Sequence, residues 1–168
     1  MGEHKHDRHE AHRQLVTRLR AQAADAARLI SGLDEDAASR RIVSGKWSLK
    51  ELLCHLWRSQ QIFAGRVAAM REQENPQVAP WDPENDSGFA DLTARTAVEA
   101  VTAFLADRER FAAVLESLAP ADWHRPGRHP EFPLYDVHFQ IEYMAFHEAH
   151  HLYQMYQRRS MISRIPHA

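Results

Sequence analysis

The segment His147-Glu148-Ala149-His150-His151 contains the side chains of this sequence that are best suited to bind a metal ion. Residues four apart on an α-helix differ by about 40° around its axis and by about 6 Å along it, so His147 and His151 project from one face. Two imidazoles with that spacing can converge on one cation. We therefore predict that His147 and His151 are metal ligands.

A third histidine, His55, has a similar place on an earlier predicted helix. It lies on the flank of an apolar stripe, from where it can meet the other two imidazoles across a bundle core. A lone histidine in such a place is more often an ordinary core residue. Taken with the later pair, however, it completes a set of three ligands. Three protein ligands leave a position open for water or substrate, the pattern of catalytic zinc.

Glu148 projects into an apolar stripe of the last predicted helix, where an unpaired carboxylate would be costly. It therefore needs a partner: a histidine, an arginine or the metal itself. We predict a catalytic role for Glu148, either orienting a ligand histidine or moving a proton. His150 points about 60° away from His147 and is assigned to the surface or to the surroundings of the ligands. Cys54 is interpreted as a packing residue.

The same pentapeptide matches the zinc protease motif H-E-x-x-H. Such proteases normally take a third ligand downstream, and the only histidine after His151 is His167. The pattern also predicts no strand that could align a peptide. A peptidase is therefore the weaker interpretation of these residues.

Four segments with the 3.6-residue period predict the helices that position these side chains. Ser48-Leu49-Lys50-Glu51 resembles a capping box and marks the start of the second. Without alternating strand patterns, an all-α four-helix bundle is the expected fold. The predicted helices are about Asp7 to Ile30, Ser48 to just before Asn75-Pro76, Leu92 to Leu118 with Val98 and Val114 in its apolar stripe, and Leu134 to Arg159.

The connections between these helices are long for a simple up-and-down bundle. Residues 75–91 can return the chain along the bundle and make the second and third helices parallel. Residues 119–133 contain His129 and four prolines and can line a pocket mouth. We find no domain boundary, so residues 1–168 are predicted to form a single domain, with residues 1–8 as a flexible polar tail.

Composition narrows the classes of function. The chain has 168 residues, 44% of them hydrophobic, and a formal net charge of −2, which is typical of a globular protein. No basic excess favours nucleic acid binding, and no segment reaches the roughly 20 apolar residues needed to cross a bilayer. One cysteine excludes an internal disulfide. The N-terminus lacks the apolar segment of a signal peptide, so a cytoplasmic protein is expected.

The segment from Lys46-Trp47-Ser48 to His55-Leu56, followed far downstream by His147 to Gln154, resembles the DinB/YfiT-like superfamily of metalloenzymes. The resemblance extends over almost the whole chain in helix number and spacing. It implies a four-helix bundle with a long crossover, a frequent homodimer, and a divalent ion, zinc or nickel, on His55, His147 and His151.

Characterised members of the family include transferases and isomerases that use a low-molecular-weight thiol such as bacillithiol, mycothiol or glutathione. The resemblance therefore implies a metal-dependent S-transferase that acts on electrophilic small molecules, with the thiol as co-substrate. A metal-dependent hydrolase is a near alternative. A metal-binding stress-response or interaction module without turnover is a third interpretation.

Overall fold

The computed structural model describes residues 3–166 of the chain, with side chains from residue 10 onward. Within this range no β-strand forms, and only two isolated β-bridges occur. The predicted all-α four-helix bundle is confirmed. The long helices are α1 (Glu3–Ile30), α3 (Leu49–Glu72), α5 (Ala97–Glu116) and α6 (Val137–Ser160), and the short ones are α2 (Glu35–Ser39) and α4 (Ser87–Thr93).

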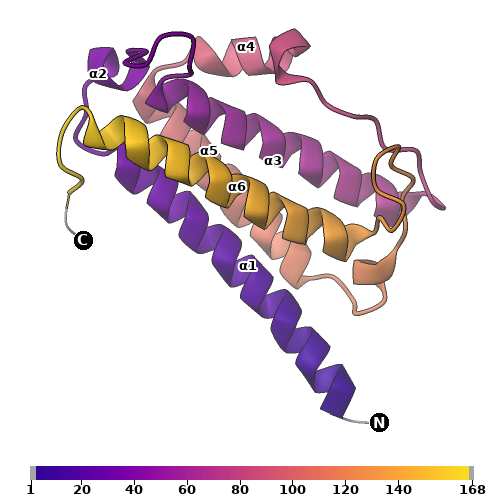
Figure 1. Cartoon of the computed structure of the whole chain (residues 1–168). Helices are drawn as coiled ribbons and strands as arrows, with labels where there is room; N and C mark the ends of the chain where they lie inside the picture. Colours follow the sequence, from indigo (N-terminus) through magenta and orange to yellow (C-terminus); the bar gives the residue numbers. More distant parts are fainter. Residues whose placement is uncertain (1–2, 167–168) are drawn as a thin grey trace.

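The bundle contains two pairs of parallel helices (Figure 1). Helices α3 and α5 run in the same direction, since Lys50 in the first turn of α3 contacts Arg95 just before α5, and Gln60 contacts Arg108 eleven residues after both helix starts. Helices α1 and α6 are also parallel, and Gln22 donates a 2.8 Å hydrogen bond to the carbonyl of Ala145. The prediction that the connection after α3 makes the second and third long helices parallel is confirmed.

Local capping explains where three of the helices begin. Ser48 and Glu51 form the predicted capping box at the start of α3. Thr96 forms a second box with Glu99 at the start of α5, and the Asp136 carboxylate caps α6. These caps satisfy backbone N–H groups that have no partner in the first turn of a helix.

The third predicted helix differs from the structure in two ways. Leu92 belongs to α4, and the chain breaks at Ala94 before α5 begins at Ala97, because Thr96 caps a new helix. Val98, assigned to the apolar stripe, is 74% exposed. The buried face instead passes through Arg108, although arginine is rarely buried without a partner.

The first helix is longer than predicted. It begins at Glu3 rather than Asp7, and no glycine or proline interrupts its sequence up to Ile30. It therefore extends into the segment predicted as a tail, of which residues 1–2 lie outside the described part of the chain. Gly32, with φ of 73°, follows its end, a position where a residue without a side chain is favoured.

The long connections meet beside one end of the bundle. The Val78 N–H donates to the Arg128 carbonyl at 2.8 Å, and the Arg128 N–H donates to the Pro76 carbonyl at 2.8 Å. Residues 73–86 and 117–136 are thereby joined into a cover over α3 and α6. This cover forms one wall of the cavity described below.

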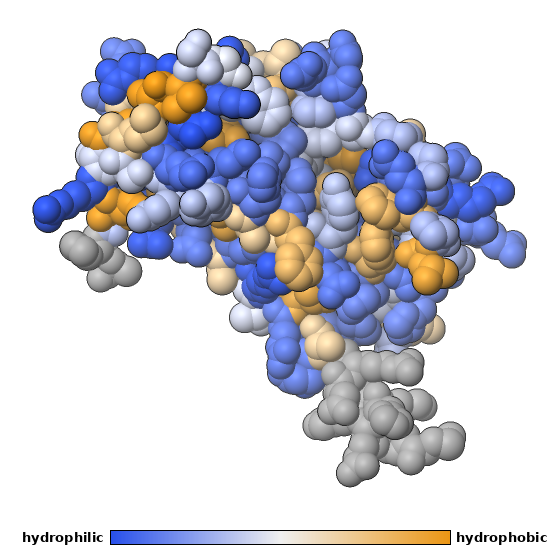
Figure 2. All heavy atoms as spheres, viewed as in Figure 1, coloured by the Kyte–Doolittle hydropathy of each residue, from blue (hydrophilic) through white to orange (hydrophobic). Residues whose placement is uncertain are grey.

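One face of the bundle is mainly polar (Figure 2). Figure 2 shows hydrophilic residues over most of this face, with smaller apolar patches between them. None of the described helices is long and apolar enough to cross a membrane.

Candidate metal centre

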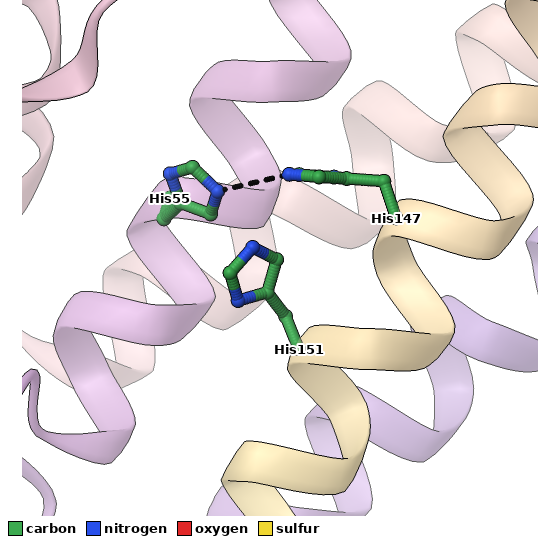
Figure 3. Close-up of side chains that lie close together, drawn as sticks. All are labelled: His55, His147 and His151. Atoms are coloured by element: carbon green, nitrogen blue, oxygen red, sulfur yellow. Dashed lines mark hydrogen bonds between the residues drawn. The ribbon is translucent and has the colours of Figure 1, made fainter.

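The structure brings His55, His147 and His151 together between α3 and α6 (Figure 3). One ring nitrogen from each histidine lies within 4.8 Å of those of the other two. The Nε2 atoms of His55 and His147 are 3.2 Å apart. Two nitrogens bound to one tetrahedral zinc ion at about 2.0–2.1 Å would be about 3.3 Å apart, so this spacing fits a shared cation.

A hydrogen bond with Gln154 determines which nitrogen of the His151 ring carries the proton. The Nδ1–H of His151 donates a 2.9 Å hydrogen bond to the Gln154 side-chain oxygen. This bond places the proton on Nδ1 and leaves the Nε2 lone pair for a cation. The amide nitrogen of Gln154 in turn contacts the His150 ring at 3.1 Å. His150 therefore contacts the site through Gln154 and does not join the cluster of three histidines.

Burial keeps the three imidazoles neutral. Burial, above all, together with the neighbouring His151 and His147, lowers the pKa of His55 to about 3. Burial likewise lowers the pKa of His147 to about 4 and depresses the pKa of His151. Neutral imidazoles have a lone pair available, which is the form that binds divalent metals.

The other nitrogens of two of these rings have no partner. The Nδ1 atoms of His55 and His147 are buried and, within the described residues, make no hydrogen bond. With the proton on Nδ1, both rings offer Nε2 to a cation. The set of three neutral nitrogen donors suits zinc, nickel, copper or iron better than magnesium or calcium.

A cavity of about 290 Å³ opens next to His55 and His147. Aromatic rings surround these two histidines: Trp81 stacks on His55 with centroids 5.3 Å apart, and Tyr143 lies parallel to His147 at 6.1 Å. The connection that contains His129 contributes to the wall, as predicted for residues 119–133. The cavity is lined by His55, Phe63, Arg66, Pro80, Trp81, Pro83, His129, Glu131, Phe132, Tyr135, Gln140, Tyr143 and His147.

Glu148 lies away from this cavity, in the core. Its carboxylate accepts hydrogen bonds from Arg108, and no hydrogen bond joins it to any of the three histidines. The partner that the sequence required is thus an arginine. Burial raises the pKa of the Glu148 carboxyl, and Arg108 opposes that shift. These contacts support a structural role, while the predicted catalytic role of Glu148 stays a prediction.

Comparison with known proteins identifies the family. The sequence profile of the DinB superfamily matches residues 18–155, most of the chain. The chain belongs to the DinB superfamily. The structure of YfiT from Bacillus subtilis, described as a probable metal-dependent hydrolase with an unusual four-helix bundle topology, superposes with a TM-score of 0.79. That match covers 90% of this chain and 87% of YfiT at 16% identity, and it shows a shared fold.

Relatives of this DinB-superfamily protein carry provisional names as metal-dependent hydrolases. One from Oceanobacillus iheyensis is 27% identical over 109 residues, which is 65% of this chain and 63% of the relative. Another, from Bacillus licheniformis, is 28% identical over 140 residues, covering 80% of this chain and 73% of the relative. The family and the histidine cluster together support a metal-binding DinB-like protein.

Several cavity residues of the DinB-superfamily protein were not singled out in the sequence. Arg66 follows His55 by eleven residues on α3, and Gln140 precedes His147 by seven on α6. Both spacings are close to whole numbers of turns, so each residue shares a helix face with a histidine of the cluster. This periodicity was the available signal. Trp81 could not be found in the same way, because it lies on an irregular connection.

Proposed function

We propose that this protein is a divalent-metal-dependent enzyme that activates a low-molecular-weight thiol for transfer to an electrophilic small molecule. The observation that carries the proposal is the position of three neutral imidazoles at the wall of an aromatic-lined cavity. A divalent ion at these nitrogens would supply Lewis acidity, which lowers the pKa of a thiol or of water.

The surroundings of the histidines favour a thiol over water. Hydrolysis benefits from a nearby base that accepts the proton of the attacking water. Within the described residues no carboxylate is hydrogen-bonded to the three rings, and Glu148 is occupied by Arg108. A thiol ionises much more readily than water and has less need of such a base.

The chain's own residues would bind and orient the reactants. Trp81, Phe132 and Tyr143 offer flat apolar walls that exclude water from the cavity. In the overall transfer, the thiol proton passes to solvent and the sulfur forms a bond to the electrophilic carbon. The leaving group departs with its bonding electron pair.

A metal-dependent hydrolase is the second candidate. The names of the relatives from Oceanobacillus iheyensis and Bacillus licheniformis support it, and Glu131 and His129 line the same cavity. Either could exchange a proton with a substrate there. The two candidates share the metal centre and differ in the nucleophile.

The metal centre that both candidate functions require is tested by the metal content of protein purified without a histidine tag. We expect one equivalent of zinc or nickel in the wild type, its loss in His147→Ala, and its retention in His124→Ala, a control histidine outside the cluster. Circular dichroism checks that each variant is folded. Wild-type protein that holds no metal after supplementation would overturn the proposal and favour a non-catalytic helical module.

Product analysis then separates the candidates. Metal-loaded protein is incubated with monobromobimane and with 4-nitrophenyl acetate, each with and without bacillithiol, mycothiol or glutathione. Transfer predicts a metal-dependent thioether product from the bimane. Metal-dependent release of nitrophenol without any thiol would instead identify a hydrolase. The homodimer implied by the family resemblance stays a prediction, which light scattering would test.

A further inference from the structure

We propose that Arg66, Gln140 and Tyr135 form a carboxylate-binding subsite at the far end of the cavity. The subsite would hold the anionic end of a small molecule whose other end reaches the three histidines. Its identification as part of a thiol site rests on the proposed function, but its contacts are independent of the metal.

Gln140 provides the first observation. Its side chain is completely buried and lines the cavity. Its oxygen accepts hydrogen bonds from the Tyr135 hydroxyl and, at 3.4 Å, from Arg66 Nη1. Because a guanidinium can only donate, this contact determines which side of the amide faces Arg66. The amide nitrogen is left buried and, within the described residues, without a hydrogen-bond partner.

An unused buried N–H donor is costly, by about 1–3 kcal/mol, and native proteins rarely leave one without an acceptor. In a cavity wall, the acceptor can come from a ligand. A ligand atom that satisfies this N–H must be an oxygen or another acceptor, which favours an anionic or polar group over a cationic or apolar one at this end of the cavity. The donor therefore indicates the chemistry of what binds there.

Arg66 provides the second observation. It is partly buried, donates a 2.6 Å hydrogen bond to the Ala79 carbonyl, and lies over the Phe63 ring at 5.5 Å. No acidic side chain of the described residues forms an ion pair with it, although Glu131 lines the same cavity. Its guanidinium has five N–H donors and is well suited to a carboxylate.

The helices determine how far this subsite lies from the histidines. Gln140 and His147 are seven residues apart on one face of α6, which corresponds to about 10 Å. The rings of Phe63 and Tyr143 lie between the two ends of the cavity and contact each other edge to face at 6.1 Å. The arrangement fits an elongated molecule with a thiol at one end and a carboxylate about 10 Å away.

Two thiols of equal length test the proposal on cobalt-loaded protein. 6-Mercaptohexanoate carries a carboxylate, and 6-mercaptohexanol is its neutral counterpart. Binding is followed by the sulfur-to-cobalt charge-transfer absorption. We expect the wild type to bind the carboxylate thiol at least about tenfold more tightly than the alcohol. This is the gain in affinity that one charge-assisted hydrogen bond provides.

The Arg66→Met variant should bring the two affinities to within about threefold, with the affinity for mercaptohexanol unchanged. Gln140→Met should reduce the preference in part. The matched control is Arg71→Met, since Arg71 is an exposed arginine of α3 outside this cavity; it should keep the wild-type preference. An Arg66→Met variant with an undiminished preference would overturn the subsite.

Hexanoate and hexanol, titrated by saturation-transfer NMR, separate this subsite from the proposed thiol chemistry. Hexanoate that binds to wild type, but not to Arg66→Met, would support the subsite even if neither thiol reaches cobalt. In that case the thiol function would be wrong and the subsite would stand. Equal binding of hexanoate and hexanol to wild type would contradict the subsite itself.

Discussion

Arg108 on α5 and Glu148 on α6 form a fully buried ion pair across the bundle. Arg108 also donates to the Gln60 side chain of α3 and to the Leu19 carbonyl of α1, so it contacts all three of the other long helices. Glu148 directly follows His147. Its attachment to Arg108 therefore holds α6 in the rotation that turns His147 and His151 toward His55.

Removal of Glu148 should destabilise the fold. Glu148→Ala leaves the Arg108 guanidinium buried without its partner, and we expect a loss of about 3–5 kcal/mol in the free energy of unfolding. Urea denaturation measures the loss. Glu142→Ala, an exposed position on the same helix, should change it by less than about 0.5 kcal/mol. A Glu148 variant of normal stability that loses only activity would instead support a catalytic carboxylate.

Gln154 should control metal affinity without contacting the metal. Gln154→Leu removes the acceptor of the His151 Nδ1–H, and we expect metal affinity to fall by about 10–100-fold. Competition with a chromogenic chelator measures the affinity. Gln154→Glu, which keeps the acceptor, should restore most of it, and Gln157→Leu on the exposed face should have no effect. Unchanged affinity in Gln154→Leu would show that the hydrogen bond is dispensable.

The Asp86 carboxylate should make the free energy of unfolding depend on pH under acidic conditions. Its hydrogen bonds with Arg58, above all, and with Trp81 and the Gly88 N–H lower its pKa from 3.8 to about 2. A lowered folded-state pKa stabilises the fold above the unfolded value, and this contribution is lost as pH falls from about 4 to about 2. It amounts to about 1–2 kcal/mol.

Urea denaturation between pH 2 and pH 6 tests this dependence. Asp86→Asn should be less stable than wild type at pH 6 and should lose less stability on acidification. Asp91→Asn, at an exposed position of α4, should follow the wild-type curve. Parallel curves for wild type and Asp86→Asn would contradict the assignment to Asp86.

Cys54 should be unreactive in the folded protein. It is fully buried, its sulfur lies 3.5 Å from the Leu92 carbonyl, and burial raises the pKa of its thiol to about 12. A thiolate is required for attack on a disulfide reagent. We expect no reaction with Ellman's reagent until the protein is unfolded in guanidinium chloride. Rapid labelling of the native protein would show that the thiol is accessible.

Local sequence patterns were sufficient to predict much of the fold. The Ser48 capping box and the 3.6-residue periodicity act within one or two turns, so they can be recognised without knowing the partner helices. The spacing of His147 and His151 is local in the same sense. Residues 75–91 were expected to make two long helices parallel, and the length of this connection was the basis for that expectation.

Tertiary contacts decided what local patterns could not. Arginine is usually exposed, yet Arg108 is buried because Glu148, forty residues away in the sequence, forms an ion pair with it. The cavity depends on the hydrogen bonds that join residues 73–86 to residues 117–136. No periodic pattern in the sequence predicts this contact between two irregular segments. The sequence alone thus determined which helices form and which histidines share a face. The tertiary structure decided which helix faces are buried and what surrounds the histidines. These features depend on the ion pair between Arg108 and Glu148 and on the hydrogen bonds between the two long connections, and such contacts join residues far apart in the chain.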